Sequence, residues 1–165
     1  MAYPTDTVYG LGCDPRNVRA LKKLSSVKGK RDKPYPILVS SFRLAQRIVV
    51  MDEKAKALAS AFWPGPLTIV ARSRARFPNL LTKGRRTIAV RCPGNPVALK
   101  LIRSCGGLLT GTSANITGRR PCTTAQAVRR VFGRRIDAVV DGGRSPQATP
   151  STIVRVKSRG IKILR

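Results

Sequence analysis

The sequence predicts an α/β protein: a single domain in which a twisted, mixed β-sheet is flanked by helices. Its length of 165 residues suits one domain with a substantial core. Its hydrophobic fraction of 42% is ordinary for a globular protein. Short apolar runs alternate along the chain with segments of helical periodicity, which is the order typical of α/β folds.

The first half of the chain contains clear helix and strand signals. Asp14-Pro15 has the pattern of an N-cap followed by proline at the first helical position. The run Trp63-Pro64-Gly65-Pro66 cannot remain helical and must end a helix. The expected elements are a helix from Asp14-Pro15 to about Gly29, a strand at 35–40, a helix capped by Ser41 and reaching Val49, a helix from about Asp52 to Trp63, a strand at 67–71, a loop or short turn at 76–81, and a strand at 87–91.

The second half continues the alternation. Asn95-Pro96 repeats the cap-then-proline pattern. The expected elements are a helix from Asn95-Pro96 to Gly106-Gly107, a strand at 108–113 that runs into a polar loop, a helix capped by Thr123 or Thr124 and stopped at Gly133, and three closing strands at 137–141, 151–156 and 161–165.

The charge balance favours an anionic ligand. Thirty-three Lys and Arg residues face seven Asp and Glu residues, for a formal net charge of +26. Such a surplus attracts nucleic acids, nucleotides or acidic lipids. Adaptation of the whole surface to a salty or acidic setting is the alternative explanation. Aromatic residues make up only 5% of the chain and form no stripe, so any contact with RNA is expected to be electrostatic.

Several kinds of chemistry are excluded by composition. The chain has no histidine, which rules out Ser-His-Asp and Cys-His catalysis and His-bearing zinc sites. The four cysteines contain no C-x-x-C pair, and acidic residues are too scarce for a carboxylate cage, so no metal-binding residues are predicted. No apolar run is long enough to span a membrane and no signal peptide is evident, so a cytoplasmic protein is expected. Hydroxyls, amides and cations remain, which favours phosphate handling.

Four polar stretches stand where strands or helices end, at 3–15, 28–34, 111–118 and 141–154. Each one alone is explained by a solvated loop or a turn, and none is a Walker loop or a G-x-G-x-x-G motif. Together they suit an anionic nucleotide and a small zwitterion. Arg91, at the end of a predicted strand, offers a two-pronged donor to a carboxylate or phosphate. The shortage of acids argues against a purely structural ion pair there.

Seven motifs in order, "YPTDTVYGLGCDP", "KGKRDKPYPILV", "WPGPLTIV", "TIAVRCPGNPVALKLI", "TSANITGRRPCT", "DGG" and "PSTIVRV", resemble the YrdC-like family of threonylcarbamoyladenylate synthases. The resemblance covers nearly the whole chain and implies a YrdC-like domain over residues 1–165 with a basic central cavity. It further implies condensation of L-threonine, bicarbonate or CO2, and ATP into threonylcarbamoyl-AMP and pyrophosphate. A transferase complex would then pass the threonylcarbamoyl group to adenosine 37 of tRNA.

The resemblance also implies roles for individual residues. Threonine would be seated by Thr5, Arg91 and Ser151, while Gly10 and Gly12 would let the chain turn away from the cavity. ATP would be faced by Lys28, Thr87, Ser113, Asn115 and Arg165, and catalysis would fall to Lys28, Lys30, Arg31, Ser113 and Asn115. Mg²⁺ would be held mainly by the phosphates of ATP and by water.

The chain departs from the family pattern in places. The family K-x-R set reads Lys28-Gly29-Lys30-Arg31 here, so either Lys30 or Arg31 takes the place of the arginine. The usual N-terminal lead-in helix and the additional C-terminal domain of some members are expected to be absent. The loop at 144–149 lacks the extra glycines often found before P-S-T.

Two functions other than the synthase activity would also account for parts of this sequence. A carbamoyl-adenylate enzyme of hydrogenase maturation would have zinc-finger-like and acylphosphatase regions that this sequence does not contain. A non-catalytic module that binds double-stranded RNA, tRNA or the ribosome would explain the charge, but it would not need a threonine pocket.

Overall fold

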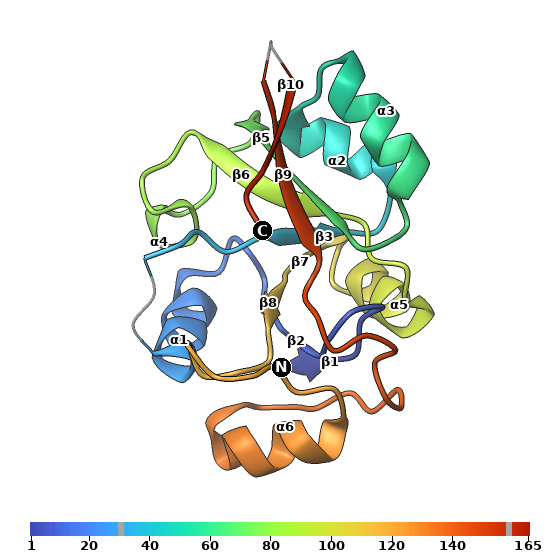
Figure 1. The fold of residues 1–165 in the computed structure, drawn as a ribbon. Coiled ribbons are helices and arrows are strands. Elements are labelled where there is room, and N and C mark those ends of the chain that lie inside the picture. The colour runs from blue at the N-terminus through green and yellow to red at the C-terminus, as the bar shows by residue number, and fades with distance from the viewer. Residues whose placement is uncertain (30–31, 158–159) are drawn as a thin grey trace.

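The computed structural model describes residues 1–29, 32–157 and 160–165, and its strands form two β-sheets (Figure 1). The larger sheet has the order β10 (Gly160–Ile163), β9 (Thr152–Lys157), β5 (Leu67–Ser73), β6 (Thr87–Arg91), β3 (Ile37–Val39) and β7 (Leu108–Thr110), with β4 (Val49–Val50) paired to β5. The smaller sheet has the order β1 (Ala2–Tyr3), β2 (Gly10–Leu11) and β8 (Thr112–Ser113). The pairs β3–β6 and β5–β9 are parallel and the other pairs are antiparallel, which confirms a mixed sheet.

The predicted mixed sheet is confirmed, but three strands form a second, smaller sheet that was not expected. The segment 108–113 was predicted as one strand, but it divides between β7 and β8, which belong to different sheets. Gly111 lies at the break and donates its backbone N–H to the carbonyl of Pro36. A Cβ at Gly111 would lie 2.4 Å from the side chain of Leu38, so the chain crosses β3 too closely for any larger residue.

The helices are α1 (Val18–Lys28), α2 (Phe42–Ile48), α3 (Glu53–Phe62), α4 (Asn79–Thr82), α5 (Pro96–Ser104) and α6 (Ala125–Phe132), followed by a 3-10 turn at Gly133–Arg135. In the view of Figure 1, α1 and α4 lie on the left of the larger sheet, α2, α3 and α5 on the right, and α6 at the bottom.

Short polar side chains cap the helices, at Ser41 and Asn95 as predicted and at Asp52 where a helix start was predicted. Each accepts a hydrogen bond from the backbone N–H three residues along. Thr124, rather than Thr123, caps α6 in the same way. The prediction of an Asp14 cap was wrong: Asp14 accepts the N–H of Arg16 in a preceding turn, and Asn17 caps α1.

Three other element boundaries also differ from expectation. Val49 belongs to β4 rather than to the helix before it, because it pairs with β5. The segment 76–81, predicted as a loop or short turn, ends in the one-turn helix α4, which extends to Thr82. The predicted strand at 137–141 makes only an isolated parallel bridge between Val139 and Ala2, because β1, its neighbour, is just two residues long.

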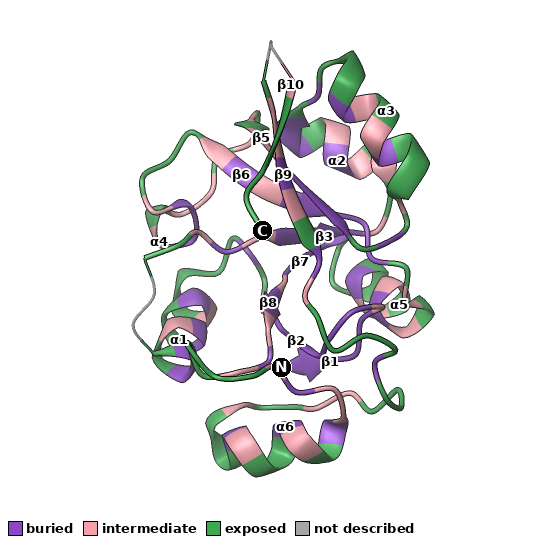
Figure 2. Cartoon of the chain, in the orientation of Figure 1, coloured by how far each residue is buried: buried purple, intermediate pink, exposed green. Residues whose placement is uncertain are grey.

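Buried residues concentrate in the sheets and on the inner faces of the helices, while β10 and the outer faces of α3 and α6 are exposed (Figure 2). One large apolar core fills most of the molecule, and a smaller cluster joins Tyr3, Leu38 and Leu109 to α5. Burial on this scale is the main stabilising contribution and holds both sheets as a rigid frame. In the described part of the chain, no helix is long and apolar enough to cross a membrane.

Candidate active site

A cavity of about 640 Å³ lies over one face of the larger sheet, between that face and the segments around β1, β2 and β8. Alternate residues of β6 (Thr87, Ala89 and Arg91) line it. Ser151, Ile153 and Arg155 line it from β9 and the residue before it. This spacing follows from the period-2 alternation of a strand, which turns every second side chain to the same face.

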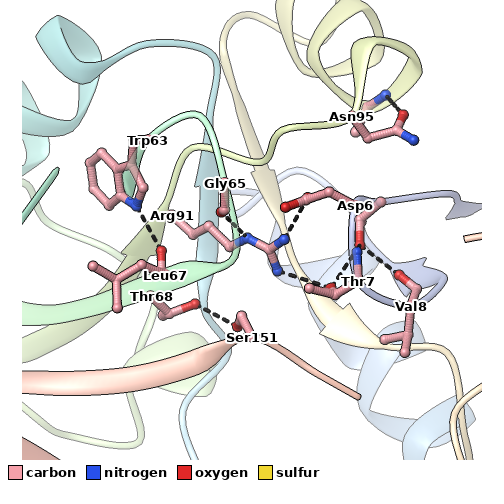
Figure 3. Close-up of polar contacts among 12 residues, drawn as sticks. Asp6, Thr7, Val8, Trp63, Gly65, Leu67, Thr68, Arg91, Asn95 and Ser151 are labelled. Carbon is pink, nitrogen blue, oxygen red and sulfur yellow. Dashed lines mark hydrogen bonds and ion pairs between the residues drawn. The ribbon is translucent and has the colours of Figure 1, made fainter. Parts of the chain in front are cut away.

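Arg91 is held at one end of this cavity, where β6 ends (Figure 3). Its Nε donates to the carbonyl oxygen of Gly65 at 2.9 Å. Its two terminal nitrogens donate to Thr7 Oγ1 at 3.2 Å and to Asp6 Oδ1 at 2.5 Å. Arg91 is only 5% exposed, so the guanidinium is both buried and fixed in orientation.

The shortage of acids, which argued against a structural ion pair at Arg91, does not prevent one from forming there. The pair with Asp6 joins residues that are 85 positions apart, which no local pattern reveals. Burial lowers the pKa of Arg91, and the neighbouring Asp6 acts in the opposite direction. The guanidinium remains charged, because arginine does not lose its proton in proteins.

Hydroxyl groups surround this end of the cavity. Thr5 Oγ1 donates to the carbonyl of Val8 at 2.7 Å and lies 3.0 Å from the hydroxyl of Thr7. Ser151 Oγ lies 2.8 Å from Thr68 Oγ1. Arg165 donates from Nε and from a terminal nitrogen to the carbonyl of Ser151, at 3.2 and 3.0 Å. The predicted threonine-site residues are thus brought together with Arg165.

Lys28 anchors the loop that follows β8. Its side chain is buried, and Nζ donates to the carbonyls of Ser113 and Asn115 at 2.7 and 2.6 Å and to Asn115 Oδ1 at 2.8 Å. The carbonyl of Lys28 in turn accepts from the backbone N–H and the hydroxyl of Thr117. Ser113 Oγ donates to Asn115 Oδ1 at 2.7 Å. Of the described residues here, Ser113 and Thr117 line the cavity, whereas Lys28 and Asn115 lie behind them.

The cavity wall is strongly basic. Its charged residues in the described part of the chain are one acid, Asp32, and five cations, Lys33, Arg85, Arg91, Arg155 and Arg165. Arg155 Nε is buried and has no hydrogen-bond partner among the described residues. A buried N–H left without an acceptor is costly, so this group suits an anionic ligand.

Some lining residues were not identified from the sequence. Thr7, Arg85 and Arg155 line the cavity but were given no role. The sequence does contain a signal for Arg155, namely strand alternation. Arg155 lies two positions after Ile153 and four after Ser151, so all three side chains share one face of the strand. Lys30 and Arg31 lie outside the described residues.

Gly12 has a different role from the one expected. A Cβ there would lie 2.4 Å from the carbonyl of Thr110 and 2.7 Å from the ring of Tyr3, so this glycine allows two layers of backbone to pack together. Gly10 lines the cavity, and a Cβ there would lie 3.1 Å from the same ring.

A resident metal ion in a protein is usually held by a cluster of His, Cys, Asp or Glu side chains. Among residues 1–29, 32–157 and 160–165, no three His, Cys, Asp or Glu side chains come together. A divalent cation that enters with a nucleotide needs only one or two protein ligands, since phosphates and water supply the others.

An α/β frame with a basic cavity lined by hydroxyls defines a class of protein that binds phosphate-bearing or carboxylate-bearing small molecules. The model of the Sua5/YciO/YrdC family, described as "Telomere recombination", matches residues 1–165. The chain belongs to this family.

The most similar relatives share one name. Threonylcarbamoyl-AMP synthase of Halorhodospira halophila is 41% identical over 155 residues, which cover 93% of this chain and 81% of the relative. The protein of the same name from Thiobacillus denitrificans is 41% identical over 167 residues, which cover 100% of this chain and 87% of the relative.

Solved structures agree with the fold. The structure of Pyrococcus abyssi Sua5 complexed with L-threonine matches with a TM-score of 0.94 and 36% identity. The match covers 99% of this chain and 49% of that one, so this chain spans about half the length of the Pyrococcus protein.

Proposed function

We propose that this protein is a threonylcarbamoyl-AMP synthase, which condenses L-threonine, bicarbonate or CO2, and ATP into threonylcarbamoyl-AMP and pyrophosphate. The observation that carries the proposal is the cavity in which Arg91, Thr5 and Ser151 meet, in a fold that matches a relative solved with L-threonine. The names of the relatives support the same reaction.

The end of the cavity at Arg91 would take the threonine. The fixed guanidinium would donate to the carboxylate of the amino acid, and the hydroxyls of Thr5 and Ser151 would bond its polar groups. Binding of this kind orients the amine without any covalent step.

The rest of the cavity wall would take ATP, and Arg165, which donates to the carbonyl of Ser151, would lie next to both ligands. Thr87, Ser113 and Arg165 line the wall and would contact the nucleotide directly. Lys28 and Asn115 would act on ATP through the loop that carries Ser113, which they hold from behind. Lys30 and Arg31 keep their predicted catalytic roles as a proposal.

The chemistry needs little acid-base work from the protein. The neutral amine of threonine adds to CO2 and loses a proton, which gives a carbamate. A carbamate oxygen then attacks the α-phosphorus of ATP, and pyrophosphate leaves with the electrons of the broken P–O bond. The residues of the cavity position the reactants and offset the developing negative charge, which are the main contributions to phosphoryl-transfer catalysis. Mg²⁺, bound chiefly by phosphates and water, would neutralise the leaving group.

The product is a reactive mixed anhydride, so a second protein must use it soon after it forms. We propose a threonylcarbamoyl transferase complex as that partner and adenosine 37 of tRNA as the acceptor, with tRNA or double-stranded RNA attracted by the basic surface. We propose the cytoplasm as the location of this activity, because ATP and tRNA are both available there.

The direct test is to incubate the protein with ATP, Mg²⁺, L-threonine and bicarbonate and to measure threonylcarbamoyl-AMP by mass spectrometry. Equal amounts of the adduct and pyrophosphate are expected, and Arg91→Ala should lose at least 100-fold in activity. L-Serine in place of L-threonine tests the pocket's selectivity. A folded protein that binds ATP but forms no adduct would contradict the proposal and favour an RNA-binding module.

A further inference from the structure

We infer that Asp6 is a positioning residue for Arg91: it fixes the orientation in which the guanidinium presents its free N–H groups to the cavity. The identification of the ligand as the carboxylate of threonine rests on the proposed function, whereas the contact between Asp6 and Arg91 is independent of that function.

Three acceptors from two segments of the chain determine where the guanidinium lies (Figure 3). Gly65, in the loop between α3 and β5, accepts from Nε, and this loop is itself tied to β6 because Gly65 N donates to Cys92 O at 2.9 Å. Asp6 and Thr7 accept from the two terminal nitrogens. Arginine has five N–H groups, so two remain for a ligand.

Of these acceptors, Asp6 is the charged one. The side chains of Arg91 and Asp6 are 6% and 17% exposed, and their nitrogen and oxygen atoms are 2.5 Å apart. Breaking such a buried pair by neutralising one partner leaves the other charge uncompensated. The other ion pairs among the described residues, exemplified by Arg129–Asp141 at 56% exposure for each side chain, lie at the surface and contribute little.

Asp6 acts through Arg91 and not on the substrate. It is absent from the cavity wall that the described residues form. Its second oxygen, Oδ2, is buried and has no hydrogen-bond partner there, and a Cβ at Gly94 would lie 3.4 Å from it. The carboxylate thus faces the loop around Gly94 with one oxygen and Arg91 with the other.

This arrangement has a consequence for binding. Because Asp6 offsets the charge of Arg91, the pair attracts an anion weakly at long range. Affinity for a carboxylate then depends on the alignment of the remaining N–H groups, which is the geometry that Asp6 fixes.

The test is Asp6→Asn, which keeps the shape and one acceptor oxygen but removes the charge. We expect the KM for L-threonine to rise about tenfold, equivalent to about 1.4 kcal/mol. The KM for ATP and the kcat at saturating threonine should each stay within about twofold. Asp137→Asn is the matched control, because it neutralises an exposed aspartate that pairs with Lys23 away from the cavity, and it should leave all three constants unchanged.

A second readout does not depend on activity. In ¹⁵N-arginine NMR spectra, the guanidinium of Arg91, assigned by its loss in Arg91→Lys, should show slow exchange with solvent and restricted rotation. Asp6→Asn should make both fast, whereas Asp137→Asn should not. If wild-type protein forms no adduct but this change occurs, the proposed function fails and the positioning role stands.

An Arg91 signal that is equally ordered in Asp6→Asn and wild type would overturn the inference. So would equal changes in both KM values and kcat, since these would indicate general damage to the fold.

Discussion

Buried polar side chains connect the two sheets around the cavity, and each does so through specific acceptors. Tyr3 of β1 is fully buried and donates its hydroxyl to the carbonyl of Thr110 in β7 at 2.6 Å. Arg91 reaches from β6 to Asp6 and Thr7, and Lys28 reaches from α1 to the loop after β8. These bonds set the width and polarity of the site as well as contributing to stability.

The phenol of Tyr3 should make stability depend on pH. Burial raises the pKa of Tyr3 above its usual range, with Arg91 opposing this only in part. Below about pH 10, the pKa of an unfolded tyrosine, the phenol is protonated in both states and its hydrogen bond stabilises the fold. Above that pH the unfolded state releases the proton first, so stability should fall by about 1.4 kcal/mol per pH unit.

Urea denaturation of wild type and Tyr3→Phe from pH 8 to pH 11 measures this contribution. At pH 8, Tyr3→Phe should be less stable by about 1–2 kcal/mol, because the carbonyl of Thr110 loses its donor. At pH 11 the difference should vanish or change sign. A difference that stays constant across the range would show that the phenol does not titrate in this way.

At the scale of elements, single short strands and caps decide where the site residues point. The three alternate residues of β6 and the matching set at β9 form the cavity floor, because β5 lies between these strands and aligns them. A helix that began or ended one residue away would shift the loops that complete the wall.

The cap of α6 provides a test at this scale. Thr124 Oγ1 accepts the N–H of Ala127 at 3.2 Å, whereas the preceding Thr123 does not cap the helix. Thr124→Ala should lower the free energy of unfolding by about 1 kcal/mol, the usual contribution of a threonine N-cap. Thr123→Ala, the adjacent control, should change it by less than about 0.5 kcal/mol. Equal effects in chemical denaturation would argue against the assigned cap.

At the scale of the whole molecule, the net charge of +26 is the dominant feature. Surface cations outnumber the acids that could pair with them, so the folded chain repels itself more than the expanded one. The same surplus gives the cavity its basic wall. The excess of positive charge therefore both attracts polyanions and destabilises the folded state through charge repulsion.

Added salt should accordingly stabilise the protein. Raising NaCl from 20 to 500 mM reduces the screening length from about 20 Å to about 4 Å, which weakens repulsion between surface charges. The Tm in a thermal unfolding experiment should rise by several degrees. A parallel series in sucrose controls for general solvent effects, and a Tm that fell in NaCl would mean that ion pairs outweigh the repulsion.

Much of the site could be predicted from the sequence, although its geometry could not. The family resemblance singles out Thr5, Thr87, Arg91, Ser113, Ser151 and Arg165, and all of them line the cavity. Asp6 belongs to the motif at 3–15, but the sequence assigns it no role, because nothing near it in the chain indicates its distant partner. Arg155 was missed although its strand alternation placed it correctly.

The sequence by itself determined local features such as the caps at Ser41 and Asn95, since a cap depends on hydrogen bonds within three residues. It also determined the α/β class, because hydrophobic periodicity is a local property. Only the tertiary structure decided the pair of Asp6 with Arg91 and the division of 108–113 between two sheets. Both depend on which distant segments meet, and that is set by the packing of the whole core rather than by neighbours in the chain.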